Sequence, residues 1–185
     1  MAILVSVPFA VELSLDPEAD AAVRRLWERL DDAGVPSLGG GGAGPYRPHV
    51  SLAVFEEGDP ARLWAELSDP VGSGVGLPLE FAGPGSFPTA DGVVFLQVVP
   101  TGHLLAFHAQ VIAAYSATPS RLRPYYDVGR FVPHCTLATG LDEGARAVAA
   151  EVLADATLPT VARVTSGALV EVPSGRVLFD RDGSG

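Results

Sequence analysis

Apolar positions along the chain follow two periods, one typical of helices and one typical of strands. After Asp16 and Pro17, apolar residues recur every three or four positions and predict a helix that stops at Gly34. The same spacing begins again at Thr101 and stops before Thr118. Asp at the N-cap and Pro at the first helical position are typical of a helix start. We therefore expect one long helix in each half of the sequence.

Shorter elements surround these helices in the same order in both halves. Asp59 and Asp142 each begin a shorter amphipathic helix. Strands are expected at residues 2–13, 75–87, 93–99, 158–172 and 176–179, and a further strand follows each long helix. The order strand, helix, strand, helix, strand thus occurs twice. It predicts a single α+β domain, residues 1–185, built from two similar lobes around a central cleft and related by a pseudo-twofold axis. The lobes are expected at about residues 1–88 and 89–185, with strand exchange between them left open.

A five-residue motif lies on the central strand of each half. The two copies are Pro48-His49-Val50-Ser51-Leu52 and Pro133-His134-Cys135-Thr136-Leu137. Side chains two positions apart on a strand share one face, so each copy presents an imidazole beside a hydroxyl, with apolar residues on the other face. The distance from helix start to histidine is 33 residues in both halves (49 − 16 and 134 − 101). This shared offset favours one paired site over two unrelated strand histidines.

Composition limits the class of protein without identifying it. A chain of 185 residues with 48% hydrophobic content can form a substantial core. The single cysteine, Cys135, excludes an intramolecular disulfide and fits a reducing, cytoplasmic location. The apolar stretch from Ala2 to Val11 is interpreted as a first strand, because Pro8 interrupts it and no basic residue precedes it. No run of apolar residues is long enough to span a membrane. We expect the protein to be a monomer.

Charge narrows the choice of partner. The chain has 22 acidic residues against 12 arginines and no lysine, which gives a net charge of −10. Proteins that bind an extended duplex carry a broad basic face, and this sequence lacks one. Arg47 lies just before the first motif and Arg130 just before the second. A locally basic cleft suits a nucleotide, a short oligonucleotide or an RNA terminus.

The paired imidazoles suit the cleavage of a phosphodiester. Such a reaction needs a base for the attacking oxygen and an acid for the departing oxygen, and histidine can serve as either near neutral pH. The hydroxyls of Ser51 and Thr136 can donate hydrogen bonds to the non-bridging phosphate oxygens. This chemistry requires neither a metal nor another cofactor.

The two motifs resemble the paired histidine-x-threonine/serine-x motifs of the 2H phosphoesterase superfamily, in particular its 2′-5′ RNA ligase and cyclic nucleotide phosphodiesterase branch. The resemblance spans nearly the whole chain and implies a bilobed α+β fold. It also implies metal-independent hydrolysis of 2′,3′-cyclic phosphates or related phosphodiesters of nucleotides or RNA ends, with 2′-5′ RNA ligase activity left open. By motif position, His49 is then the acid, His134 the base, and Ser51 and Thr136 bind the phosphate.

The segment 120–131 is a second candidate for substrate contact. Arg130 can pair with a phosphate, and Tyr125, Tyr126 or Phe131 can stack on a base. The alternative is a packed loop whose aromatic rings face inward and whose arginines lie in water.

Other noticeable residues have simpler interpretations. His108 lies on the apolar face of its helix and is expected in the core, whereas His103 is expected at the surface. Cys135 is expected to be a small buried side chain. The glycine-rich stretch 39–44 lacks the Lys-Ser/Thr of a phosphate-binding loop and is interpreted as a flexible connector, with a lid as the alternative.

Two other functions compete with the phosphodiesterase. A noncatalytic nucleotide or RNA-end binding protein would keep the cleft without turnover, but it would not need both an acid and a base. A metal-binding protein would use both histidines as ligands, but no Asp, Glu or further His completes a ligand set at either motif.

Overall fold

The elements of the folded chain follow the order expected from the hydrophobic pattern. The structure, a computed structural model, describes residues 7–40, 46–115 and 118–182. Its helices are α1 (Pro17–Asp32), α2 (Pro60–Gly72), α3 (Gly102–Tyr115) and α4 (Glu143–Ala154), with a short 3₁₀ helix, η1 (Pro124–Tyr126). Its strands are β1 (Phe9–Leu15), β2 (His49–Glu57), β3 (Pro78–Ser86), β4 (Val94–Val98), β5 (Arg121–Leu122), β6 (His134–Ala138), β7 (Val161–Glu171) and β8 (Arg176–Asp182). The α+β class is confirmed.

The helix starts predicted from the sequence are confirmed by their caps. The Asp16 side chain accepts from the backbone N–H groups of Glu18 and Ala19, both at 3.1 Å. Asp59 and Asp142 cap α2 and α4 in the same way. The Thr101 hydroxyl accepts from the first turn of α3. Each cap satisfies backbone donors that the helix itself cannot pair.

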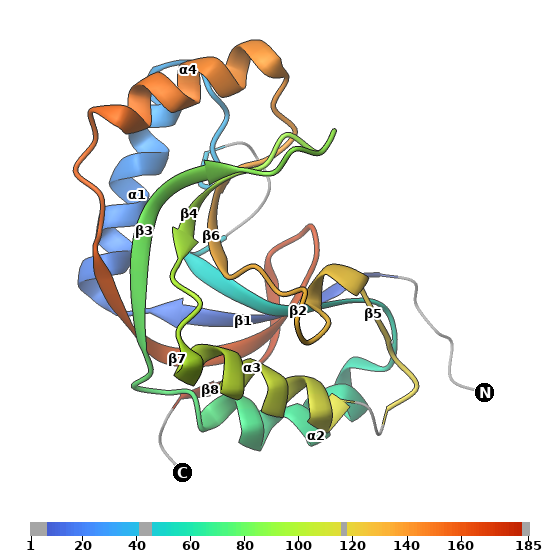
Figure 1. Ribbon diagram of the computed structural model, residues 1–185. Helices are drawn as coiled ribbons and strands as arrows, with labels where there is room; N and C mark the ends of the chain where they lie inside the picture. Colours follow the sequence, from blue (N-terminus) through green and yellow to red (C-terminus); the bar gives the residue numbers. More distant parts are fainter. Residues whose placement is uncertain (1–6, 41–45, 116–117, 183–185) are drawn as a thin grey trace.

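The strands form one antiparallel sheet in the order β5-β2-β1-β7-β3-β4-β6, with β8 pairing β7. The two motif strands, β2 and β6, lie near opposite ends of this order, yet they contact each other (Figure 1). The sheet therefore curls until its ends approach. A backbone hydrogen bond of 2.8 Å from Leu38 N–H to Leu137 C=O ties the segment after α1 to β6, and the Cys135 thiol lies against the backbone of His49.

Strand pairing crosses the midpoint of the sequence. β7 pairs along its length with β1, from Phe9↔Glu171 to Leu15↔Val164, and its first residues pair with β3. β3 in turn pairs with β4. Helix α1 packs against α4, and α2 packs against α3 (Figure 1). Each group of packed elements thus draws on both halves of the sequence.

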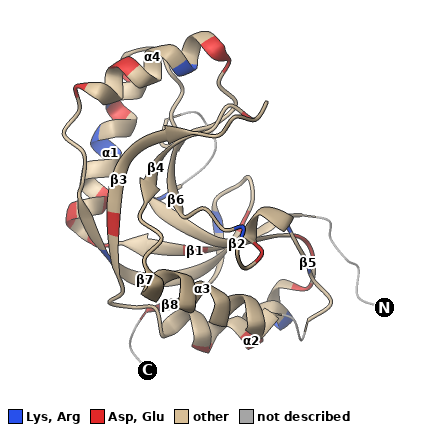
Figure 2. Ribbon diagram, viewed as in Figure 1, with Lys and Arg blue, Asp and Glu red and all other residues tan. Residues whose placement is uncertain are grey.

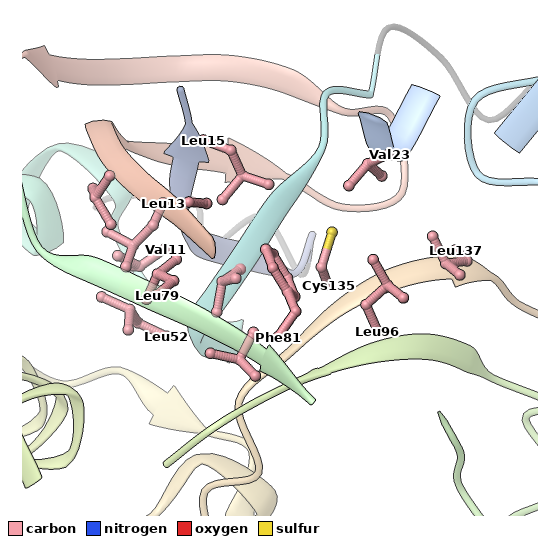
Figure 3. Close-up of a cluster of buried hydrophobic side chains, with 14 of the residues drawn as sticks. Val11, Leu13, Leu15, Val23, Leu52, Leu79, Phe81, Leu96, Cys135 and Leu137 are labelled. Atoms are coloured by element: carbon pink, nitrogen blue, oxygen red, sulfur yellow. The ribbon is translucent and has the colours of Figure 1, made fainter. Parts of the chain in front are cut away.

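The apolar residues of both motifs lie in the hydrophobic core. Val50, Leu52, Cys135 and Leu137 are fully buried. Figure 3 shows the Leu52, Cys135 and Leu137 side chains within a cluster that also contains Leu13 and other aliphatic side chains. The alternation of the motif is therefore as predicted, with one face in the core.

Two predicted segments extend beyond what the structure describes. Residues 2–6 of the first expected strand and residues 41–45 of the glycine-rich stretch lie outside the described residues. Among the residues that are described, no helix is both long and apolar enough to cross a membrane. Figure 2 shows acidic residues on the ribbons of α1, α2 and α4, in keeping with the net charge.

Candidate active site

His49 is held by the backbone that leads into β2. Its Nδ1 lies 2.7 Å from the carbonyl oxygen of Arg47. A carbonyl oxygen only accepts, so Nδ1 carries a hydrogen and donates it. The nitrogen left for other chemistry is therefore Nε2. The side chain is largely buried, and the Tyr46 ring stacks beside it with the ring centroids 6.0 Å apart.

His134 is held in the same way at the start of β6. Its Nδ1 donates to the carbonyl oxygen of Val132, also at 2.7 Å, which again leaves Nε2. The rings of Phe87 and Phe95 pack against it, with centroids 5.0 and 5.2 Å from the imidazole. Burial among these groups lowers the pKa of His134, and the nearby His49 lowers it further, against the opposing effect of the Val132 hydrogen bond.

One cavity collects the four polar side chains of the motifs. It has a volume of about 600 Å³ and is lined by His49, Ser51, His134 and Thr136, among others. This volume is in the range of small-molecule sites. Two segments about 85 residues apart (134 − 49) thus contribute matching imidazole and hydroxyl groups to one space.

The segment 120–131 forms one wall of this cavity. Tyr125 is 69% exposed, and Arg130 is exposed at the same wall. Tyr126 faces inward and forms a side-chain hydrogen bond with Ser51, and burial raises its pKa to about 12. Phe131 is buried and stacks on His108. The segment therefore combines the two interpretations drawn from the sequence, since two of its aromatic rings face inward and one faces solvent.

Arg47 lies apart from the main cavity. It is exposed and lines a smaller neighbouring cavity of about 180 Å³, together with His49, Glu12 and Tyr46. Arg123, another arginine of the segment 120–131, also lines the main cavity and lies 3.8 Å from Glu56. Of the two arginines predicted to meet substrate, Arg130 lines the main cavity and Arg47 the smaller one.

The remaining histidines and the cysteine have the places expected of them. His108 is 1% exposed, its Nε2 lies 3.1 Å from the Leu52 carbonyl oxygen, and its ring stacks on Phe131 at 3.9 Å between centroids. Burial lowers the pKa of His108. His103 is exposed. Cys135 is fully buried, and burial raises the pKa of its thiol to about 12.

Sequence reasoning missed Glu12 as a member of the site. Its side chain is on β1, is largely buried, and places Oε1 3.4 Å from His49 Nε2. Burial raises the pKa of this carboxyl, and His49 opposes the rise. The sequence did contain a signal for it, since Glu12 is the single acidic residue within the apolar strand Phe9–Leu15. A carboxyl group is rarely buried on a strand unless it has a partner or a functional role.

Among residues 7–40, 46–115 and 118–182, the structure contains no group of three or more His, Cys, Asp or Glu side chains placed to hold a metal ion.

Comparisons with known proteins show the family and the fold of the chain. A family model described as the 2′-5′ RNA ligase superfamily matches residues 15–176, whereas no curated protein matches the sequence closely enough to count as a relative. The structure of E. coli LigT complexed with 3′-AMP is similar with a TM-score of 0.60 and 17% identity, over 97% of this chain and 100% of that chain. A second structure, described as a phosphoesterase, has a TM-score of 0.56 and 18% identity, over 96% and 98% of the two chains. Since the family model covers most of the sequence, the chain belongs to the 2′-5′ RNA ligase superfamily and has the LigT-like 2H phosphoesterase fold.

Proposed function

We propose that this protein is a metal-independent phosphodiesterase that hydrolyses 2′,3′-cyclic phosphates or related phosphodiesters of nucleotides or RNA ends. The observation that carries the proposal is the single cavity lined by two imidazoles and two hydroxyls. Both imidazoles have Nδ1 fixed by a backbone carbonyl, so each offers Nε2 to a ligand in the cavity. Membership of a phosphoesterase and ligase superfamily supports phosphodiester chemistry in general.

In the proposed reaction the two histidines act on opposite sides of one phosphorus atom. Neutral His134 removes a proton from water as the water oxygen bonds to phosphorus. Protonated His49 donates its Nε2 proton to the ester oxygen as its bond to phosphorus breaks. Ser51 and Thr136 donate hydrogen bonds to the non-bridging oxygens, where negative charge increases. His134 then releases its proton to solvent and His49 takes one up from solvent, which restores the starting state.

The assignment of His134 as the base follows from its surroundings. Phenyl rings pack on it, and burial lowers its pKa, so its neutral form is favoured near neutral pH. His49, by contrast, has its Nε2 3.4 Å from the buried carboxyl group of Glu12. We assign the acid to His49 on this basis, and the two roles exchange if the reaction runs in reverse.

The size and charge of the site favour a small ligand. The cavity of about 600 Å³ accommodates a nucleotide, and the chain carries a net charge of −10. Solved structures of LigT with 3′-AMP, ATP and NADP⁺ are similar in fold, with TM-scores of 0.60, 0.52 and 0.53. We propose a nucleotide, short oligonucleotide or RNA terminus as substrate, with Arg130 near a phosphate and the exposed Tyr125 ring stacking on a base.

We expect turnover without any added metal. The purified protein is assayed against 2′,3′-cyclic nucleotides and against 2′-5′ and 3′-5′ linked dinucleotides in the presence of EDTA. Products are separated by chromatography, which also shows whether the 2′- or the 3′-phosphate is released. Activity that EDTA removes and only a divalent ion restores would favour the metal-binding alternative. Binding without turnover of any member of the panel would favour a noncatalytic binding protein.

We also expect a bell-shaped dependence of kcat/KM on pH. The acidic limb reports protonation of the base, and His134 has a pKa below the ordinary value of 6.5. The rate therefore falls on the acidic side only at pH values below 6.5, where His134 gains a proton. A rate that is already half-lost above pH 7 on this limb would contradict the assignment. Initial rates in constant-ionic-strength buffers provide the measurement.

A further inference from the structure

We propose that Glu12 is a positioning residue that keeps a proton on Nε2 of His49, and thereby makes the two halves of a duplicated site chemically unequal. The inference rests on the proposed function, in which His49 acts as the acid. It adds a residue from outside both motifs and gives it a role that the motifs themselves do not contain.

The geometry around His49 leaves one place for this proton. Nδ1 already donates to the Arg47 carbonyl, so a neutral ring would present a bare lone pair at Nε2. The Glu12 oxygen lies 3.4 Å from that nitrogen. Two facing lone pairs repel, so the pair is stable only with one proton between the oxygen and the nitrogen. This contact is longer than a usual N–H···O hydrogen bond, and His49 also lines the main cavity.

The same position in the second half of the chain carries a different residue. Glu12 pairs with Ser51 across β1 and β2, and Phe95 pairs with Thr136 across β4 and β6. Ser51 and Thr136 are each the hydroxyl residue of their motif, so Glu12 and Phe95 occupy equivalent positions beside the two motifs. The duplicated sheet thus places a carboxyl group beside one histidine and a phenyl ring beside the other. Within the part of the chain that the structure describes, no carboxylate forms an ion pair with His134.

These neighbours have opposite effects on a nearby imidazole. A carboxylate within a few ångströms stabilises the imidazolium, whereas an apolar ring excludes water and favours the neutral form. A sequence repeat alone would give two equivalent histidines. Glu12 and Phe95 make one of them a proton donor and the other a proton acceptor at the same pH.

The proton balance of the reaction is unchanged by Glu12. The Nε2 proton of His49 passes to the departing ester oxygen, and the Glu12 carboxylate then faces a neutral imidazole. One proton from solvent returns to the pair and restores it. Glu12 forms no bond to phosphorus and is not consumed.

Other ionisable groups lie near this pair and must be considered when it titrates. Burial and the neighbouring Glu12 raise the pKa of Tyr46, and Glu12 and Arg123 act in opposite directions on Tyr126. Other ionisable residues line the two cavities around the pair: Tyr46 and Arg47 before β2, Glu56 on β2, Asp91 before β4, Arg123, Tyr125, Tyr126 and Arg130 in the segment 120–131, His134 on β6 and Asp180 on β8. Of these, only Asp91 is altered in the experiment below.

The experiment compares the full-length protein with Glu12→Gln and with Asp91→Asn. Glutamine keeps the size of the side chain, but it carries no negative charge and can donate to Nε2. Asp91 is an exposed carboxylate that lines the same cavity, whereas the ion pair of His49 is with Glu12, so its replacement removes an equal charge without removing that contact. The His49 pKa is measured by NMR titration of ¹⁵N-labelled histidine, with His49→Ala used to assign the signal.

We expect the His49 pKa to fall by at least 1 unit in Glu12→Gln and to be unchanged in Asp91→Asn. The alkaline limb of the pH–rate profile should move by the same amount, so that kcat at pH 8 falls about tenfold or more while the acidic limb is preserved. A His49 pKa within 0.3 unit of the wild type would overturn the inference. The titration needs no turnover, so inactivity of the wild type on every substrate would refute the proposed function and leave the role of Glu12 decided by NMR.

A second variant covers the case in which Glu12→Gln does not fold. Glu12→Asp keeps the charge but draws the carboxylate back by one methylene. It should shift the His49 pKa in the same direction by a smaller amount. Circular dichroism melts confirm that both variants are folded, and an unshifted His49 in a folded Glu12→Asp would also count against the inference.

Discussion

Replacing His49 or His134 with alanine should lower kcat on a 2′,3′-cyclic nucleotide by about 10²–10⁴-fold, the usual contribution of a positioned acid or base. Both side chains line the same cavity and offer Nε2 to it. Removing either leaves the reaction without one of its two proton transfers. The double variant should be little worse than the single ones, because the two groups act in one step. Steady-state kinetics at the optimal pH give the comparison.

The control for these variants is His103→Ala. His103 is an exposed histidine on α3 and lies away from the cavity, so its loss should leave kcat unchanged. Thermal melts should show that all four variants are folded. Full activity in either His49→Ala or His134→Ala would remove the proposed mechanism.

Replacing Leu52 or Leu137 with alanine should instead destabilise the fold by about 2–5 kcal/mol, as is usual for a leucine removed from a well-packed core. These residues end the two motifs and are fully buried on the face opposite the cavity. Urea denaturation followed by fluorescence measures the free energy of unfolding. Leu105→Ala on α3 is the matched control, because Leu105 is 41% exposed and its loss should cost much less.

The two sets of variants separate the two faces of one motif. The histidine variants should lose turnover and keep stability, whereas the leucine variants should lose stability and keep the rate per folded molecule. A leucine variant as stable as the wild type would mean that the alternation of the motif strand has no energetic role, contrary to its complete burial.

Local features of this fold could be predicted because their causes lie within a few residues. Asp16, Asp59 and Asp142 cap their helices through side-chain contacts two or three positions away. The alternation of His49 and Ser51 with buried apolar neighbours follows from the geometry of a strand. The α+β class followed from the repeated order of these elements.

Features that depend on distant pairing could not be predicted in the same way. The contact of Glu12 with His49 arises because β1 pairs with β2 at a register that places Glu12 opposite Ser51, next to a bulge at Val11 and Glu12. Nothing within a few residues of either side chain specifies that register. Similarly, the short strand Arg121–Leu122 forms only because the edge of β2 is available to it. The sequence showed this segment simply as a loop with arginines and aromatics.

The crossing of strands between the two halves affects the order in which the protein can fold during translation. Strand β1 has β7 as one of its two neighbours, and β7 begins 152 residues later (161 − 9). At a synthesis rate of about 5–20 residues per second, one edge of β1 waits roughly 8–30 s for its partner. The central sheet therefore stays incomplete until β7 has emerged from the ribosome, long after β1 and β2 have been made.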